Sequence, residues 1–153
     1  MLDWRAIGLG ILAQMSYLGV LYAAWPLRGK LIQSLALVAL TGVLGGVVAG
    51  RLATEHGFDR IRHGLISGIG GGAVFALSFF GIKSTPGLAH GAYWSVGFVM
   101  ATNIPFPGLM LRDGGLWLVV GWSLLGGVVI AGLGLLAGYL TPPASEGLVF
   151  IRE

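Results

Sequence analysis

The chain has 153 residues, of which 56% are hydrophobic and only 10% are charged, and its mean hydropathy is +0.87. A water-soluble domain carries about 25% charged residues, so this composition excludes an ordinary soluble domain and predicts an integral membrane protein. The formal net charge is +3, from nine Lys and Arg against six Asp and Glu. Because the basic residues flank apolar runs, we expect them to meet lipid headgroups and not nucleic acid.

Several apolar runs are long enough to cross a bilayer, which takes about 20 helical residues. The first run, residues 6–24, lies between Trp4 and Trp25, which would be roughly 32 Å apart on a helix, the separation of two interfacial aromatic belts. It is longer than the apolar core of a secretory signal, so we expect it to be retained as a span. We predict one transmembrane domain over residues 1–140, an extramembrane tail at 141–153, and further spans at 31–53, 64–82, 87–103 and 116–140.

The segment 87–103 is the shortest of these candidates, at about 17 residues, near the lower limit for crossing. Gly87, Gly91 and Ser95 recur at every fourth position and give this helix a smooth stripe, which favours close packing in lipid. We therefore predict an all-α polytopic bundle of five transmembrane helices, the fourth of them short. The alternative is four spans with residues 87–103 as a re-entrant or interfacial helix.

Residues 54–63 carry the densest charge in the chain and are predicted to form a loop, with Asp59 capping the next helix. The basic residues divide almost equally between the two sides of the membrane, and this short loop favours a cytoplasmic N-terminus in the plasma or inner membrane of the cell. We expect the following residues to lie at the lipid headgroup interface: Arg51, Arg60, Arg62, Trp4, Trp25 and Trp117.

Glycine accounts for 28 of the 153 residues. Helix association in lipid depends on close backbone approach, which glycine allows, although glycine is also simply common in membrane helices. Two runs with four-residue spacing predict that the second and third spans pack as a tight antiparallel hairpin, and whether these grooves face neighbours in this chain or in another subunit is open. The helix-packing candidates are Gly42, Gly46, Gly50, Gly64, Gly68, Gly72, Gly87, Gly91, Ser95, Gly126, Gly134 and Gly138.

Two pairs of segments resemble each other within the chain. Residues 18–24 are similar to residues 96–102, and the sequence LGGVV at 44–48 recurs at 125–129. With five spans the two helix pairs would have opposite orientations, as in the inverted repeats of many transporters. The alternative is a chance match in a chain rich in glycine, valine and leucine.

Residues able to carry chemistry are scarce. The absence of cysteine excludes disulfides, thiolate metal sites and thiol nucleophiles, and the absence of Asp, Glu, Lys or His at the centre of a predicted span disfavours a proton-coupled pump. His56 and His63 could hold a metal with Glu55 or Asp59, but histidines in a solvated loop are more often surface residues. We predict that the protein is not an enzyme and has no catalytic residue, no cofactor and no metal.

The function that this pattern favours is that of an accessory or assembly subunit, which packs through its glycine grooves as a homo-oligomer or within a larger membrane complex. The alternative is a small channel or facilitator for a neutral or weakly polar solute, built from inverted two-helix repeats. Its path would be lined by Gln14, Ser95 and Asn103. Gln14 is of most interest because a mid-span amide has four hydrogen-bonding positions to satisfy.

Overall fold

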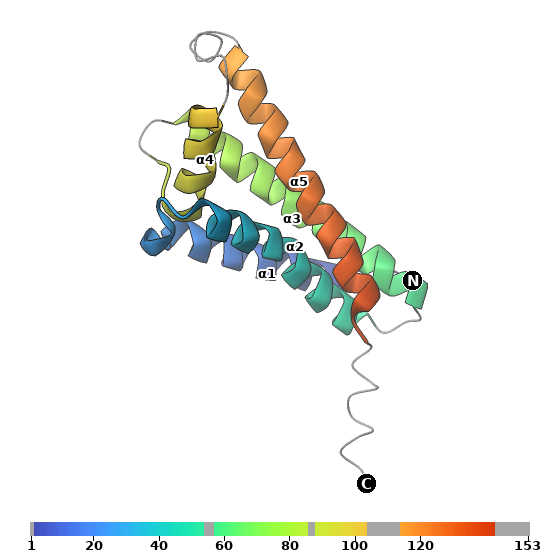
Figure 1. The fold of residues 1–153 in the computed structure, drawn as a ribbon. Helices are drawn as coiled ribbons and strands as arrows, with labels where there is room; N and C mark the ends of the chain where they lie inside the picture. Colours follow the sequence, from blue (N-terminus) through green and yellow to red (C-terminus); the bar gives the residue numbers. More distant parts are fainter. Residues whose placement is uncertain (1, 54–56, 86–87, 104–113, 143–153) are drawn as a thin grey trace.

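The computed structural model describes residues 2–53, 57–85, 88–103 and 114–142. This part of the chain is helical, and Figure 1 shows its elements: α1 (Trp4–Ala23), the 3-10 turn η1 (Trp25–Leu27), α2 (Leu31–Leu52), α3 (Gly57–Ser84), α4 (Gly91–Asn103) and α5 (Gly114–Leu140). Four of them, α1, α2, α3 and α5, are long and apolar enough to cross a membrane. The all-helical membrane architecture predicted from composition is thus confirmed at this level.

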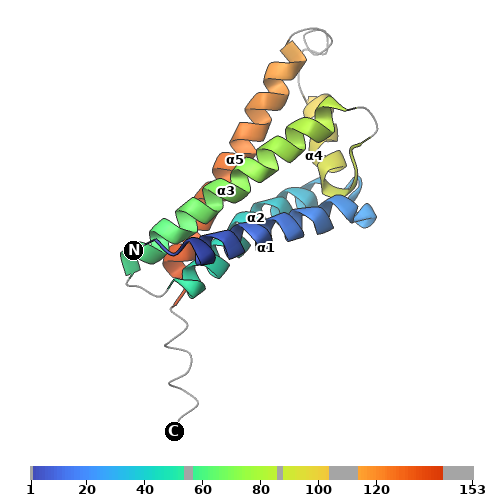
Figure 2. The same cartoon turned by 180° about the vertical axis from the view of Figure 1, so that it is seen from behind.

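The helices are arranged as a wedge of two layers. In Figures 1 and 2, α1 and α2 lie side by side in one layer, and α3 and α5 form a second layer that crosses it. The layers converge where α1 and α3 begin and α2 and α5 end, which we call the closed end. They diverge toward the opposite, open end, where the short helix α4 lies between them.

Contacts between glycine backbones fix the relative directions of the helices. Along the contact between α2 and α5 the residue numbers increase in the same direction on both helices, so α2 and α5 run parallel. The contacts are Gly42 with Ile130, Gly46 with Gly134 and Gly50 with Gly138. On α3 the order is reversed, so α3 and α5 run antiparallel: Gly64 meets Gly138, Gly68 meets Gly134 and Gly72 meets Gly127. An inverted repeat needs α2 and α5 to run in opposite directions, so that prediction is wrong, and the LGGVV match falls on parallel helices.

The beginning of α3 also differs from the predicted loop at 54–63. The helix starts at Gly57, so Asp59 lies in its first turn and does not cap it. A carboxylate there interacts favourably with the positive end of the helix dipole, and the long Arg60 and Arg62 side chains can reach the interface from within a helix. The residue that does cap a helix is Asp3, whose carboxylate accepts hydrogen bonds from the backbone N–H groups of Arg5 and Ala6 at the start of α1.

The short helix α4 has 13 residues and begins at Gly91, so it is only about 20 Å long. Gly91 has φ +50° and packs against the carbonyl oxygens of Leu21 and Tyr22 at the end of α1. A side chain at this position would be strained and would collide with them. Gly87, the first member of the predicted stripe, lies outside the described residues.

An aromatic cluster inside the wedge holds α4 against the long helices. Phe75 and Phe79 of α3 stack with ring centroids 5.6 Å apart, and Tyr93 of α4 lies 5.8 Å and 6.1 Å from them. All three side chains are buried. Leu18 and Leu21 of α1, Val38 of α2 and Ile130 of α5 complete this core, so all five helices meet here.

Candidate functional site

The predicted polar residue Gln14 lies fully buried where α1, α2 and α3 meet. Its Nε2 donates to the backbone carbonyl of Ser67 at 3.0 Å and to the Ser67 hydroxyl at 3.1 Å, and that hydroxyl donates to the carbonyl of Gly45 at 3.3 Å. The Gln14 amide occupies the positions that Cβ atoms at Gly45 and Gly71 would take. These two glycines therefore form a hole into which Gln14 fits.

The Oε1 atom of Gln14 accepts no hydrogen bond. It lies against the Cα of Gly71, where the glycine hydrogens can provide a weak C–H···O contact. The amide is thus enclosed by backbone and leaves no room for a solute beside it. Gln14 links three helices, and the hole that receives it comes from glycines outside the predicted four-residue series.

Ser95, the second candidate for a solute path, lies on α4 at the open end. Its hydroxyl donates to the carbonyl of Leu27 at 2.6 Å and accepts from the N–H of Gly29 at 2.9 Å. Gln14 lies about 14 Å before the end of α1 along its axis, so the structure does not bring these two side chains together. Asn103 is the last residue of α4, and its side chain lies outside the described part of the chain.

The predicted glycine hairpin between the second and third spans is wrong in one respect: the glycine runs of α2 and α3 do not face each other. Both face α5, where Cβ atoms would collide with backbone. Gly134 and Gly138 of α5 receive glycines from both helices, whereas Gly126 lies against the ring of Phe75. The predicted smooth faces therefore meet partners within this chain, and sequence analysis missed Gly127, which contacts Gly72.

At the closed end, His63 is buried on α3, in contrast to the solvated loop predicted at 54–63. Its Nδ1 lies 2.6 Å from the carbonyl oxygen of Asp59, and its Nε2 accepts the backbone N–H of Asp3 at 2.7 Å. These bonds fit a neutral imidazole with the proton on Nδ1, which ties the beginning of α1 to α3. Three or more His, Asp or Glu residues do not gather as a metal site within the described residues, and Glu55 and His56 lie outside them.

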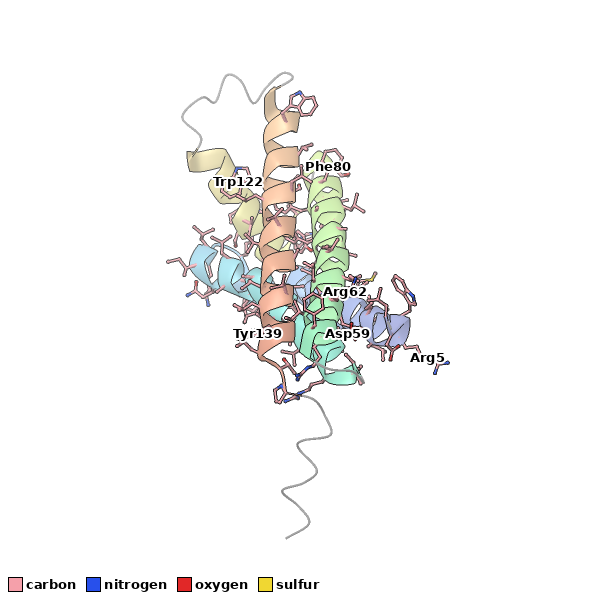
Figure 3. The ribbon with its side chains drawn as sticks, turned by 90° about the vertical axis from the view of Figure 1, so that its right-hand side faces the viewer. Arg5, Asp59, Arg62, Phe80, Trp122 and Tyr139 are labelled. Carbon is pink, nitrogen blue, oxygen red and sulfur yellow. The ribbon has the colours of Figure 1, made fainter. Side chains whose placement is uncertain are left out.

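The predicted headgroup residues occupy different environments. Arg60 donates from Nη1 to the carbonyl of Thr141 at 3.0 Å, which places a cation at the negative end of α5. Figure 3 shows Asp59 and Arg62 near the beginning of α3, at the same end of the bundle as Tyr139 near the end of α5. The Arg62 guanidinium lies 5.9 Å from the Phe58 ring. The remaining members of the predicted set are exposed: Arg51, Trp4, Trp25 and Trp117.

At the open end the structure reveals a cluster that sequence analysis did not assemble. The guanidinium of Arg28 lies between two indole rings, 4.9 Å from the centroid of Trp25 and 4.8 Å from that of Trp94. The His90 ring lies 6.4 Å from Trp25 and 5.5 Å from Tyr22. We call Arg28 with its two tryptophans the arginine clamp. The three-residue spacing of Trp25 and Arg28 could have indicated the first of these contacts. The second ring, Trp94, comes from α4, far along the chain, and nothing in the sequence indicated it.

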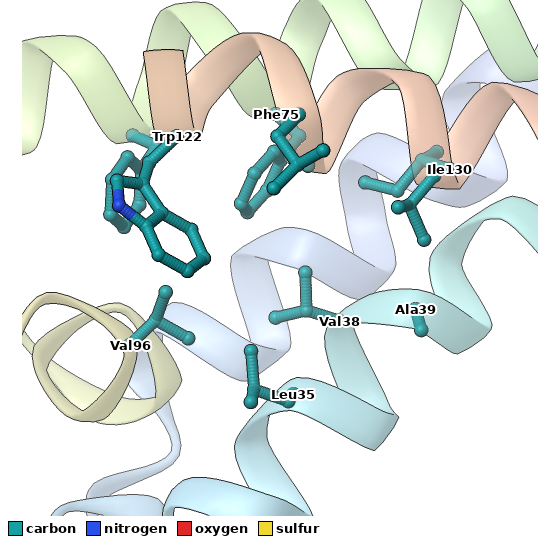
Figure 4. Close-up of a pocket in the computed structure, with 11 residues that line it drawn as sticks. Leu35, Val38, Ala39, Phe75, Val96, Trp122 and Ile130 are labelled. Carbon is teal, nitrogen blue, oxygen red and sulfur yellow. The ribbon is translucent and has the colours of Figure 1, made fainter. Parts of the chain in front are cut away.

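Two grooves flank α4. The front groove, of about 130 Å³, lies between α2, α4 and α5, and Figure 4 shows its apolar lining, which includes Leu35, Val38, Ala39, Val96, Trp122 and Ile130. The back groove, of about 250 Å³, lies between α1, α3 and α4 and is lined by Met15, Leu18, Gly19, Tyr22, Val74, Ser78, Ile82 and Tyr93.

The back groove differs from the front groove by the hydroxyl groups in its lining, which belong to Tyr22, Ser78 and Tyr93. The Tyr22 hydroxyl donates to the carbonyl of Leu88 at 2.9 Å. The hydroxyls of Ser78 and Tyr93 lie 3.1 Å apart, and Ser78 also donates to the carbonyl of Phe75 at 3.0 Å. The pair thus satisfies itself and leaves an otherwise apolar surface.

No model of a known protein family matches this chain, and the comparisons with curated proteins and with solved structures gave no match. The class of the protein therefore rests on its own geometry: a helical bundle with four helices able to cross a membrane and a short helix wedged between its layers.

Proposed function

We propose that the chain is a non-enzymatic integral membrane protein that acts as an accessory or assembly subunit and binds its partner through α5. The observation that carries this proposal is that α5 is the least covered of the four long helices. Only 17% of its most apolar stretch is buried, against 33% in each of the other three. A helix that the rest of its own chain leaves so open is available to a second membrane helix.

The outward face of α5 has the spacing of a helix-packing seam. Its residues alternate between steps of four and three, and all are exposed except the half-buried Leu135: Gly121, Leu125, Val128, Gly132, Leu135 and Tyr139. This spacing suits the left-handed crossing that most membrane helices adopt. No atom lies within 4 Å of a Cβ built at Gly121 or Gly132, so these two glycines are free for close approach, whereas the inward ones are used by the fold.

The proposal includes a topology of four spans, with α4 as a re-entrant or interfacial helix at the open end. α3 and α5 run antiparallel, so α5 must begin on the side of the membrane where α3 ends. This is the case only if α4, which lies between them in the chain, does not cross. Its length of about 20 Å agrees with this. Both termini then lie on one side, which we place in the cytoplasm of a cell whose plasma or inner membrane holds the protein.

The channel alternative has less support. It depends on inverted repeats, which the parallel course of α2 and α5 contradicts, and on a path through Gln14, which glycine backbone encloses.

The proposal is tested by native mass spectrometry of the protein extracted gently from its own membrane. We expect a homo-oligomer or a complex with another membrane subunit, and we expect the double variant Gly121→Leu and Gly132→Leu to lose it, because the added side chains block close approach of a partner helix. Gly8→Leu is the matched control, since a Cβ at Gly8 of α1 also meets no atom within 4 Å. A strictly monomeric wild-type protein, or a complex that survives the double variant, would contradict the proposal.

A further inference from the structure

Arg28 of the arginine clamp is exposed, and its guanidinium lies over two indole rings, 4.9 Å from the centroid of Trp25 and 4.8 Å from that of Trp94. Within the described part of the chain, no acceptor or acidic side chain pairs with its N–H groups. The two ring contacts restrict the Arg28 side chain and leave its N–H groups open to a ligand. A fixed guanidinium edge is suited to bidentate hydrogen bonds with a phosphate.

The back groove leads to this clamp. Tyr22 lines the groove and packs edge to face on His90, and the His90 ring in turn lies 6.4 Å from Trp25 of the clamp. At the floor of the groove, a Cβ at Gly19 would meet no atom within 4 Å. The groove therefore has the surface for an apolar chain, and Tyr22 in its lining connects it through His90 to Trp25 of the clamp, just after the end of α1.

Charge at the open end favours a negatively charged ligand. Lys83 is half-buried, extends over Gly97 of α4 and follows Ile82, which lines the groove. With Arg28 and Lys30, this places three basic side chains around the open end. Both acids among the described residues, Asp3 and Asp59, lie at the closed end, at the starts of α1 and α3. A positive cluster next to a membrane surface attracts anionic lipid headgroups.

We propose that this end of the protein binds an anionic phospholipid, with the phosphate at the edge of Arg28 and an acyl chain in the back groove over Gly19. The two parts of the site match the two parts of such a lipid, and a soluble anion would use only the first. The proposal does not depend on the α5 partner, because the back groove is formed by α1, α3 and α4.

The experiment is native mass spectrometry of purified protein titrated with phosphatidylglycerol and, separately, with phosphatidylcholine of the same acyl chains. We expect phosphatidylglycerol to bind more tightly, and we expect Arg28→Gln to weaken its binding at least about tenfold, the factor that one charge-assisted hydrogen bond supplies. Arg5→Gln is the charge-matched control, because it removes an exposed positive charge at the closed end, and it should leave phosphatidylglycerol binding unchanged.

A second pair of variants tests the groove. Gly19→Leu fills the open space over Gly19 and should reduce binding of both lipids, whereas Gly8→Leu, at the other open glycine of the same helix, should not. Far-UV circular dichroism on heating checks that each variant is folded. Equal binding of the two lipids by the wild type, unchanged phosphatidylglycerol binding by Arg28→Gln, or equal binding by the two glycine variants would overturn the proposal. If Arg28→Gln loses lipid binding but keeps the α5 complex, the lipid site and the partner site are independent. The two proposals can therefore fail separately.

Discussion

Gln14 shows how a polar side chain can be fixed in a membrane bundle by the absence of side chains opposite it. Its hydrogen bonds to Ser67 join α1 to α3, yet bonds between membrane helices contribute only about 0.6 kcal/mol on average. The larger effect is steric, because Gly45 and Gly71 leave the space that the amide fills. An added methyl group in such a place costs about 1–3 kcal/mol.

We predict that Gly71→Ala lowers the free energy of unfolding by about 1–3 kcal/mol, since its Cβ would overlap the Gln14 amide. In a Gln14→Ala background the same change should cost much less, which gives a coupling of at least about 1 kcal/mol in a double-mutant cycle. The measurement is unfolding in mixed detergent micelles, followed by circular dichroism. Gly81→Ala, with no atom within 4 Å of its Cβ, is the control. Equal losses in both backgrounds would show that the hole is not what holds Gln14.

His63 makes a second prediction at this scale. Replacing it with Leu fills a similar volume but leaves the backbone N–H of Asp3 without its acceptor. This bond is only part-buried, so we expect a loss of about 1 kcal/mol, the low end of the range for a fully buried donor. We expect His63→Leu to lower the unfolding free energy by about 1 kcal/mol and to abolish the exchange protection of the Asp3 amide in hydrogen–deuterium exchange. Asp3 protection equal to that of the wild type would contradict the assignment. His90→Leu, an exposed histidine at the other end, should leave that amide protected.

At the scale of the elements, α5 is the helix against which α2 and α3 both place their glycines. The closeness of contact varies along α2: a Cβ at Gly46 would overlap Gly134 and lie 2.9 Å from the Cβ of Ala137, whereas one at Gly50 would lie 3.2 Å from the Cα of Gly138. Because the steric cost rises with overlap, the two positions should respond differently to the same substitution.

We therefore predict a graded series in which Gly46→Ala destabilises the bundle by about 2–3 kcal/mol and Gly50→Ala by about 1 kcal/mol or less. Gly81→Ala should be neutral or slightly stabilising, because alanine has the higher helix propensity. The same micelle unfolding assay measures all three. If Gly46→Ala were tolerated as well as Gly81→Ala, the glycine face of α2 would not be packed on α5.

The four-residue glycine spacing predicted which face of each helix is smooth, but it could not predict the partner. The two glycine runs predicted that the second and third spans form a hairpin, yet in the structure both runs face α5. Gly45 and Gly71 were beyond sequence analysis because the side chain that requires them, Gln14, lies on another helix. In the same way, His63 binds the backbone of Asp3, 60 positions away, a contact that its own neighbourhood in the sequence does not reveal. Its neighbours are charged, and for this reason sequence analysis placed it in a loop.

At the scale of the whole molecule, charge does not decide the topology. With four spans, the side of the N-terminus carries Arg5, Arg51, Arg60, Arg62 and Arg152, and the other carries Arg28, Lys30, Lys83 and Arg112. With five spans, Arg112 and Arg152 exchange sides and the division stays five to four. The positive-inside rule depends on a difference between the sides, so the number of crossings has to come from the packing, in which α3 and α5 are antiparallel.

Labelling of single cysteines distinguishes the two topologies, and a chain without cysteine gives a clean background. We predict that Leu2→Cys and Pro142→Cys react with a membrane-impermeant maleimide from one side, and that Lys30→Cys and Gly114→Cys react from the other, because α5 begins at the open end and returns to the closed end. Thr85→Cys calibrates the assay, since it shares the side of Lys30 whether or not α4 crosses. If Pro142→Cys reacted together with Lys30→Cys, α4 would have to cross the membrane, and the antiparallel packing of α3 and α5 could not exist in the bilayer.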